Sequence, residues 1–383
     1  MKRTAIAAVA LTLSSMTIAA HAQNSVTLYG LIDAGIGYVH NADSNSNLTG
    51  MINGNLSGDR WGLKGSEDLG GGLKTIFALE SGFDVGTGKM GQGTRLFGRQ
   101  AYVGFQGDKW GTVTLGRQYD PITDTVQGVT ADNFFGSTFA TPGDVDNNDN
   151  SARISNAVKY VSPTYAGFQF EGLYAFSGVA GQAGQGYTYS GAATYTAGAL
   201  SLAAGYLRAT NNSATAARTS WASSTTDSIF DSHINDGYVT AKSVSIAQIG
   251  GQYVLGSFTM GASYSNTQLK ADASSTFSST EKYNSGKAFV AYQATPALIA
   301  GVGYAYTAAS GDTSAHYHQV SIGADYNLSK RTDFYAVAAY QHANGTQRLS
   351  DGTTQAAQAS IGSYGYNGTS TQEIAIVGIR HKF

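Results

Sequence analysis

The sequence predicts an all-β protein, a sixteen-stranded antiparallel barrel that spans a membrane. Apolar residues alternate with small or polar ones and never lengthen into a helix-sized apolar run. Such period-two patterning gives strands with one apolar face. The chain has 49 glycines but only 4 prolines, and proline is unwelcome in long strands because it lacks a ladder donor. Only 13% of residues are charged, which is low for a soluble sandwich and typical of a barrel with an apolar outside and a polar lumen.

The alternating segments are the strand candidates. In one of them, Phe168, Phe170 and Tyr174 share one parity, opposite Gln169 and Glu171. An even number of segments of about ten residues is typical of bacterial outer-membrane barrels. The sixteen candidates begin near Val26, Asp59, Leu73, Arg95, Thr112, Ile154, Gly167, Tyr187, Leu200, Ser243, Phe258, Lys282, Leu298, Tyr317, Thr332 and Gln372.

The connections alternate between tight turns and long polar stretches. This predicts a barrel with short periplasmic turns at one end and long external loops at the other. A soluble Greek-key sandwich would not be expected to alternate so strictly. The long stretches are residues 40–53, 84–94, 119–152, 177–186, 210–242, 270–281, 308–315 and 343–371.

The two ends of the sequence are predicted to have different roles. Lys2 and Arg3 precede an apolar stretch that leads to Ala20-His21-Ala22, so residues 1–22 are predicted to be a secretory signal peptide. Residues 23–383 then form the barrel. The segment from Thr371 alternates up to Phe383, and we expect it to pair with the first strand, because an unpaired strand edge in lipid is costly.

Composition argues against several other classes of protein. The 25 acidic residues outnumber the 23 basic ones, which disfavours nucleic-acid binding, and without cysteine no disulfide can form. His316 and His318 share a strand face near His342, but no serine motif or complete metal-ligand set accompanies them. An outer-membrane enzyme is therefore the weaker alternative, and we expect no catalysis, cofactor or metal.

Several stretches resemble the betaproteobacterial branch of the trimeric general porins. They are residues 25–33, 61–74, 96–104, 111–120, 328–333 and 378–383. The resemblance implies a homotrimer in the outer membrane, in contact with its lipid and lipopolysaccharide. It also implies a third external loop folded into the barrel, passive diffusion of ions and small hydrophilic solutes, and a terminal Phe383 read by the outer-membrane assembly machinery.

The predicted inward loop is acidic. No lysine or arginine interrupts it before Arg153, so we expect it to be positioned against a basic wall. It departs from the family in lacking a Pro-Glu-Phe-Gly tip, so its acids cannot be matched one by one, and Asp132 is chosen as the constriction acid. Its acids are Asp120, Asp124, Asp132, Asp144, Asp146 and Asp149.

The predicted basic wall follows from strand parity. Trp61 and Leu63 take the outward parity, so Arg60 and Lys64 face the lumen. On the fourth strand either Arg99 faces the lumen and Gln100 the outside, or the reverse. The resemblance implies that Arg60, Arg99 and Arg153 are constriction arginines. The predicted pore constriction is Arg60, Arg99, Arg153, Lys64, Glu80 and Asp132; the alternative is that these are ordinary solvated lumen residues.

The function that these features predict is a general porin that favours anions, since at least three arginines point inward. A substrate-specific channel is the alternative, in which Phe134, Phe135 and Phe139 form a track for sugars. Packing of those rings against the barrel wall is the simpler interpretation. A structural or adhesive barrel with a blocked lumen is a third class.

Overall fold

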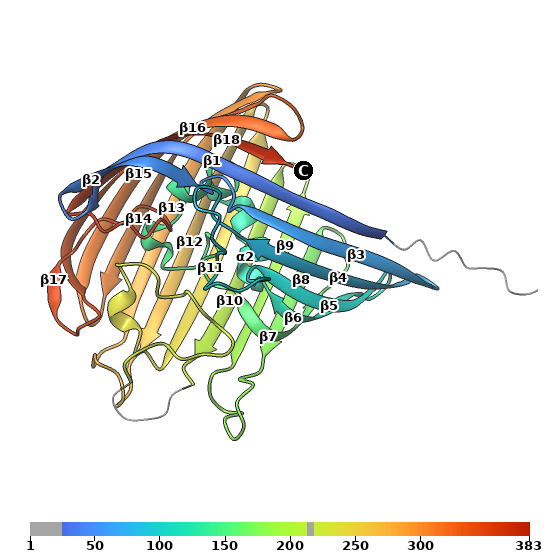
Figure 1. Ribbon diagram of the computed structural model, residues 1–383, viewed down its shortest axis with the longest axis horizontal. Coiled ribbons are helices and arrows are strands. Elements are labelled where there is room, and N and C mark those ends of the chain that lie inside the picture. The colour runs from blue at the N-terminus through green and yellow to red at the C-terminus, as the bar shows by residue number, and fades with distance from the viewer. Residues whose placement is uncertain (1–24, 213–217) are drawn as a thin grey trace, which may run out of the picture.

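The computed structural model describes residues 25–212 and 218–383 as one closed barrel of antiparallel strands (Figure 1). The predicted signal peptide lies outside the described residues. No helix in the described part of the chain is long and apolar enough to cross a bilayer. The strands are β1 Ser25–Asp43, β2 Ser46–Asn53, β3 Arg60–Gly70, β4 Leu73–Gly82, β5 Gln100–Gly107, β6 Gly111–Gln118, β7 Ile154–Val161, β8 Phe168–Ala175, β9 Thr188–Ala197, β10 Leu200–Thr210, β11 Ser243–Leu255, β12 Phe258–Lys270, β13 Glu281–Thr295, β14 Leu298–Ser310, β15 Ser314–Asn327, β16 Thr332–Arg348, β17 Thr354–Ala356 and β18 Thr371–Lys382.

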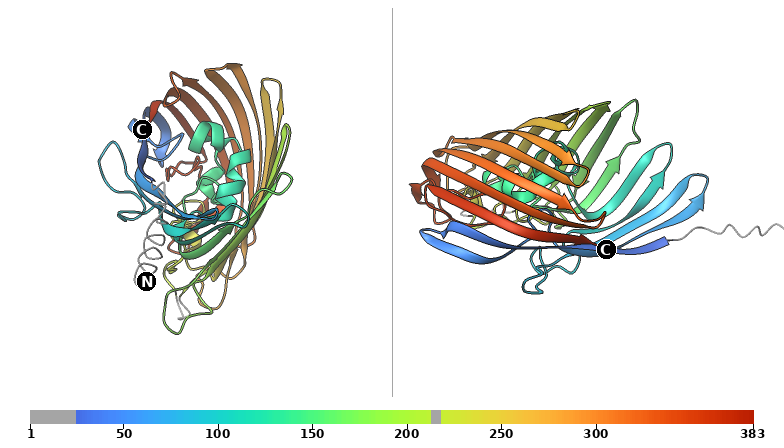
Figure 2. Two further views of the ribbon diagram at one scale, coloured as in Figure 1. Left: turned by 90° about the vertical axis from the view of Figure 1, so that its right-hand side faces the viewer. Right: turned by 90° about the horizontal axis from the view of Figure 1, so that it is seen from above.

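The wall contains sixteen strands, as the sequence predicts. β2 and β3 both pair with β1 and together form one interrupted strand, while β17 is a short addition to the outer end of β16. The barrel closes between β1 and β18, in register from Leu31 opposite Lys382 to His40 opposite Glu373. Figure 2 shows the C-terminus beside β1. Closure leaves no strand edge for lipid to solvate.

The two faces of the wall have the predicted polarity. Phe168 and Phe170 on β8, and Ile322 on β15, are large apolar side chains exposed on the outside. Ser321 and Asp325 alternate with Ile322 and are buried on the lumen side. This alternation is what a sheet with lipid on one side and a polar interior requires.

The second strand differs from its prediction. Residues 40–53 are not a loop: β1 runs on to Asp43 and turns into β2, whose outer face alternates only briefly because the polar Thr49 precedes the apolar Met51. Between β2 and β3 the chain leaves the ladder. There the carboxylate of Asp33 accepts the backbone N–H groups of Leu56 and Ser57 at 2.7 and 2.9 Å. This break turns residues 54–58 toward the lumen.

The fourth strand also begins later than predicted, at Gln100 rather than near Arg95. Arg95 and Arg99 therefore do not share a strand face. Gln100 lies directly opposite Glu80 of β4, and cross-strand partners share a face, so Gln100 points into the lumen and not outward. Arg99 lies just before the strand, so the alternation of the strand does not fix its direction. The side chains of Arg99 and Gln100 can therefore both face inward.

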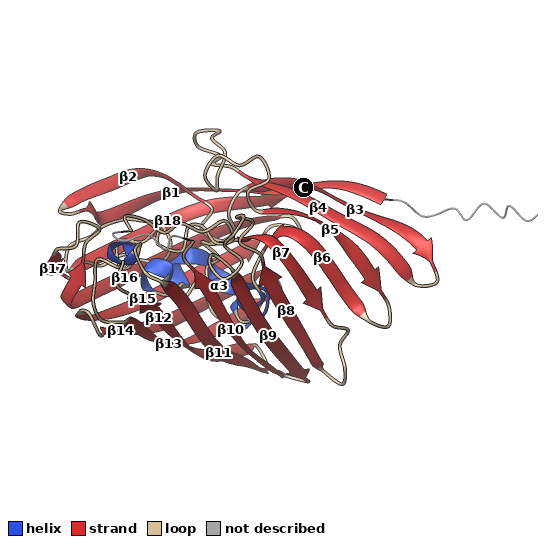
Figure 3. Ribbon diagram, turned by 90° about the horizontal axis from the view of Figure 1, so that it is seen from below, coloured by secondary structure: helices blue, strands red, loops and turns tan. Residues whose placement is uncertain are grey.

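The segment between β6 and β7, which we call the inward loop (residues 119–153), lies inside the barrel as the resemblance implied (Figures 2 and 3). It is built from short helices because its donors must be satisfied away from any ladder. Asp120 caps the first helix by accepting the N–H groups of Ile122 and Thr123. The elements are the α-helices α2 Pro121–Thr125 and α3 Asp132–Phe135, and the 3₁₀ helices η1 Gln127–Val129, η2 Gly136–Phe139 and η3 Pro142–Asp144; a sixth short helix among the described residues, η4 Asp236–Tyr238, lies between β10 and β11.

The inward loop is packed onto one side of the barrel, against β9 to β16. The rings of Phe135 and Phe139 are buried where the wall has glycines instead of side chains. A Cβ on Gly301 would lie 2.4 Å from the Phe135 ring, and one on Gly303 would lie 2.9 Å from Phe139. The glycines thus create the space that the loop occupies, and the open part of the lumen is left on the opposite side.

We predict that Gly301→Leu lowers single-channel conductance in planar bilayers. The leucine fills the space of the Phe135 ring and pushes the inward loop across the lumen, with an overpacking cost of about 1–3 kcal/mol. Gly286→Leu on neighbouring β13 is the matched control, because a Cβ there meets no atom within 4 Å. Equal conductance for both variants and the wild type would contradict the packing described.

Candidate functional site

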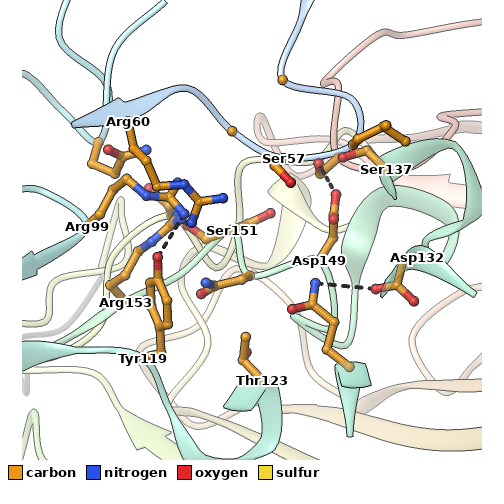
Figure 4. Close-up of a pocket in the computed structure, with 18 of the residues that line it drawn as sticks. Ser57, Arg60, Arg99, Tyr119, Thr123, Asp132, Ser137, Asp149, Ser151 and Arg153 are labelled. Carbon is orange, nitrogen blue, oxygen red and sulfur yellow. Dashed lines mark hydrogen bonds between the residues drawn. The ribbon is translucent and has the colours of Figure 1, made fainter. Parts of the chain in front are cut away.

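A polar cavity of about 650 Å³ lies between the inward loop and the wall formed by β3 to β7. Figure 4 shows the arginines on one side of it and acidic side chains of the loop on the other. Its lining includes Ser57, Arg60, Arg99, Tyr119, Thr123, Asp124, Asp132, Ser137, Asp149, Ser151, Arg153, Ser228, Asp231 and Ser363.

The three predicted arginines come together although they come from three different parts of the chain. Arg60 is the first residue of β3 and follows the break in the second strand. Arg99 precedes β5, and Arg153 ends the inward loop just before β7. Arg99 and Arg153 stand just outside their strands, where the ladder does not dictate the direction of the side chain, whereas Arg60 is paired in the wall and points inward by strand parity.

Tyr119 lies at the centre of the arginine group. Arg99 donates to the Tyr119 hydroxyl at 2.7 Å, and that hydroxyl donates to Glu80 at 3.0 Å. Arg99 also donates directly to Glu80 at 2.8 Å. The guanidinium of Arg153 lies 5.5 Å from the centroid of the Tyr119 ring, at cation–π distance. One tyrosine and one glutamate therefore hold guanidinium groups that would otherwise repel one another.

Two of the arginines keep donors free. The Nε atoms of Arg60 and Arg153 are buried and have no hydrogen-bond partner among the described residues. Burial, and next the guanidinium of Arg99, lower the pKa of Arg153 to about 10, so it stays charged at neutral pH. Buried guanidinium groups with unused donors are suited to bind an anion in the cavity.

The predicted acid, Asp132, lines the cavity but turns its carboxylate toward the far wall. It accepts from Thr130 and from Asn148, and it lies 3.8 Å from the Lys287 ammonium on β13. Asp149 is less buried, and Ser363 donates to it at 2.5 Å. Burial, followed by the carboxylate of Asp132, raises the pKa of Asp149 to about 6. The acid that faces the arginines most directly is therefore Asp149 (Figure 4).

Lys159 and Lys287 are further functional residues on the wall; strand parity in the sequence indicates that Lys159 faces the lumen, as Arg153 does, but Lys287 was not identified. Lys159 on β7 pairs with Asp124 of α2 and lies 3.5 Å from Glu171 on β8. Lys287 pairs with Asp132 of α3 from the opposite side of the barrel. Each lysine fixes one helix of the inward loop to the wall. Inward parity could have indicated Lys287 as well, but not which loop acid each lysine would meet.

Neutral side chains anchor the rest of the inward loop. Gln248 on β11 donates to the Asp146 carbonyl at 2.5 Å, and Ser265 on β12 donates to the Asp146 carboxylate at 2.6 Å. Gln319 on β15 donates to the carbonyls of Thr138 and Ala140, both at 3.1 Å. The loop therefore has a defined position and is not a freely moving segment.

Two further predicted residues have different positions. Glu80 does not line the cavity itself but pairs with Arg99 and accepts from the Tyr29 hydroxyl at 2.9 Å. Lys64 is not brought into the cluster. It lies on the lumen face nearer the short turns, exposed, with its ammonium 5.1 Å from the centroid of the Tyr29 ring.

The aromatic residues of the inward loop pack against the wall and do not form a track. Phe135 and Phe139 are buried, with ring centroids 4.8 Å apart. Phe134 is half-buried, and its ring centroid is 5.7 Å from that of Phe289 on β13. The predicted packing is confirmed, and a sliding surface for sugars has no support in these residues.

Comparisons with known proteins agree with this architecture. Residues 5–346 match the family model described as Gram-negative porin. The chain is 30% identical to outer membrane porin protein 32 of Delftia acidovorans, with 100% of both chains covered. It is 44% identical over 192 residues to an outer membrane porin protein of Bordetella pertussis, a match that spans about half of that relative's length, 49%. Among solved structures it is similar to an anion-selective porin from Comamonas acidovorans, with a TM-score of 0.71 and 24% identity, covering 94% of this chain and 100% of that one. The chain belongs to the Gram-negative porin family and forms a channel across the outer membrane.

Proposed function

We propose that this porin is a general diffusion channel for ions and small hydrophilic solutes and that it favours anions. The observation that carries the proposal is the group of Arg60, Arg99 and Arg153 around one polar cavity. Glu80 neutralises one of the three positive charges, so that wall keeps an excess of two. The similar structure from Comamonas acidovorans is described as anion-selective, which supports the same preference here.

The proposed mechanism is electrostatic. A positive wall faces the carboxylates of Asp124 and Asp149 across the same cavity, which sets up a field across the path. Such a field orients water and polar solutes and makes entry of large apolar solutes costly. An anion passing the arginines is attracted by the excess positive charge of that wall.

We propose that the channel works as a homotrimer, surrounded by outer-membrane lipid and lipopolysaccharide. One of the similar structures is described as the trimer form of OmpT from Vibrio cholerae, with a TM-score of 0.65 and 17% identity. We further propose that Phe383 is read by the outer-membrane assembly machinery. The backbone of Phe383 forms hydrogen bonds with Gly30 of β1 at 3.0 and 3.1 Å. Its side chain is 43% exposed even in the closed barrel, so another protein can reach it, which supports this proposal.

We also propose that the protein is not an enzyme. His316 and His318 lie on the outer face of β15, on the same parity as the lipid-facing Ile322. Their Nδ1 atoms are paired with the hydroxyls of Tyr306 and Tyr304 at 2.8 and 2.7 Å. Histidines held in this way, outside the lumen, do not converge on the cavity that solutes traverse.

One prediction concerns the positive charge of the arginines. Arg60→Ala together with Arg99→Ala should shift the reversal potential under a salt gradient toward cation preference, because the wall loses two of its positive charges. The measurement is made in planar bilayers. Arg331→Ala, an exposed arginine in a short turn, is the control and should behave like the wild type. A wild type that prefers cations, or no shift in the double variant, would remove the proposal.

The second prediction concerns pH. Above pH 6 Asp149 is a carboxylate, and below pH 6 it becomes neutral, so anion preference should rise as the pH falls from 8 to 5. Asp149→Asn should show the stronger preference already at pH 8 and a smaller change with pH. Asp351→Asn is the control, because hydrogen bonds from Thr353 lower the pKa of that exposed acid and keep it charged throughout. An unchanged reversal potential in the wild type would contradict the role of Asp149.

The third prediction separates a general pore from a substrate-specific channel. Proteoliposomes should swell in a graded series of sugars with a smooth decline in rate as sugar size increases. Tyr119 is the one aromatic residue in the described lining of the cavity, and a single ring does not form a stacking track for one sugar. Saturable uptake of a single sugar would favour the specific channel instead.

A further inference from the structure

The segment between β10 and β11 does not extend away from the barrel. We define residues 225–238 of this segment as the strap. At one end, the Ser155 N–H of β7 donates to the Thr225 carbonyl at 2.7 Å, and Thr226 forms an antiparallel bridge with Ile154. The hydroxyl of Thr188, at the start of β9, lies 2.7 Å from that of Thr226. This end is thus joined to the edge of the barrel near β7.

Ion pairs hold the same end from the other side. Asp227 accepts from Arg117 of β6 at 3.1 and 3.2 Å, and it lies 2.7 Å from Arg95 of the segment before β5. Arg117 also donates to the Gly98 carbonyl at 2.8 Å. Asp227 therefore connects the strap to the strands that carry the arginine wall.

The other end of the strap is bound across the barrel. Tyr283 of β13 donates to the Ile234 carbonyl at 2.8 Å, and Gln347 of β16 donates to the His233 carbonyl at 3.1 Å. In the order of the wall, β13 and β16 are six and nine strands away from β7. In a ring of sixteen strands these are opposite sides, so the strap crosses the mouth of the channel.

Apolar packing fixes the strap between these anchors. Ile229, Phe230 and Ile234 are buried and share a cluster with Val145 of the inward loop and with inward side chains of the wall. The contact with the inward loop is close: a Cβ on Gly143 would lie 2.2 Å from the Ser232 hydroxyl. The strap therefore rests directly on the inward loop at this point, and the cavity between the two is small, about 20 Å³.

Asp231 stands out among the strap residues. Its neighbours in the strap are buried, whereas Asp231 is exposed and lines the same cavity as Arg60, Arg99 and Arg153. It takes part in no ion pair within residues 25–212 and 218–383. A carboxylate without a partner in a confined polar cavity acts on every ion that passes.

We propose that the strap is a fixed second constriction and that Asp231 is a specificity-determining residue. Its negative charge opposes the arginines and moderates the preference for anions. The inference rests on the proposed function, because it assigns Asp231 to the same solute path. Size selection then depends on residues 225–238 as well as on the inward loop.

The test uses the absence of native cysteine, which makes an introduced thiol unique. Asp231→Cys is labelled with methanethiosulfonate reagents that carry either a trimethylammonium or a sulfonate group. Both should reduce single-channel conductance, by about a quarter or more, because the added group occupies the path. The ammonium reagent should shift the reversal potential toward anions, and the sulfonate reagent toward cations.

Asp351→Cys is the matched control, an exposed acid between β16 and β17 that does not line the cavity. It should be labelled by both reagents without any change in current. A labelled Asp231→Cys with unchanged current, or a thiol at 231 that neither reagent reaches, would overturn the proposal. If the arginine variants change selectivity and the labelled Asp231→Cys does not, the proposal for the strap is overturned while the proposed function stands.

The fixed position of the strap is tested by Thr188→Cys with Thr226→Cys. The pair should oxidise to a disulfide, and the oxidised and reduced channels should conduct equally, because the link only joins parts that already touch. Failure of the thiols to oxidise, or a conductance that rises on reduction, would show that the strap lies elsewhere or moves during conduction.

Discussion

The aromatic side chains of the inward loop pack against glycines of the barrel wall, and the position of the open part of the lumen depends on this contact. Phe135 and Phe139 occupy the space left by Gly301 and Gly303. Because the loop is held on that side, the polar cavity lies on the other, beside the arginines. The proposed selectivity thus depends on two things: the apolar packing that places the cavity, and the charges that line it.

Polar anchoring completes what the packing begins. Glutamine, serine and lysine side chains on the inner faces of β11 to β16 bond to the inward loop, and Gln341 of β16 bonds in the same way to Ser360 of the segment after β17. Buried loop carbonyls would be costly without such partners. The inward loop, the strap and the segment after β17 are therefore all bound to the wall or to one another. The path that remains is lined by charged side chains.

Much of the fold could be predicted from period-two patterning, because lipid on one side and water on the other impose alternation at each strand. The prediction was wrong where this pressure is absent. On the outer face of β2 the polar Thr49 interrupts the apolar pattern next to Met51, and residues 95–99 show strand-like parity without pairing in the wall.

The site could be predicted only in part. Arg60, Arg99 and Arg153 were identified because the resemblance marked them and strand parity placed basic residues on the lumen side. The direction of Asp132, the lysines that pair with the loop, and the strap with Asp231 could not be read from spacing. Most of them depend on contacts between segments more than a hundred residues apart, such as Arg117 with Asp227 and Asp132 with Lys287, whereas Lys159 and Asp124 are 35 residues apart.

If ions pass between the inward loop and the arginine wall, anions should bind there. A crystal structure from crystals soaked in bromide, with anomalous scattering used to locate the anions, tests this. We expect bromide beside Arg60, Arg99 and Arg153, with a second position near the mouth on the arginine side of Asp231. Bromide confined to the opposite side, between the inward loop and β11 to β15, would contradict it.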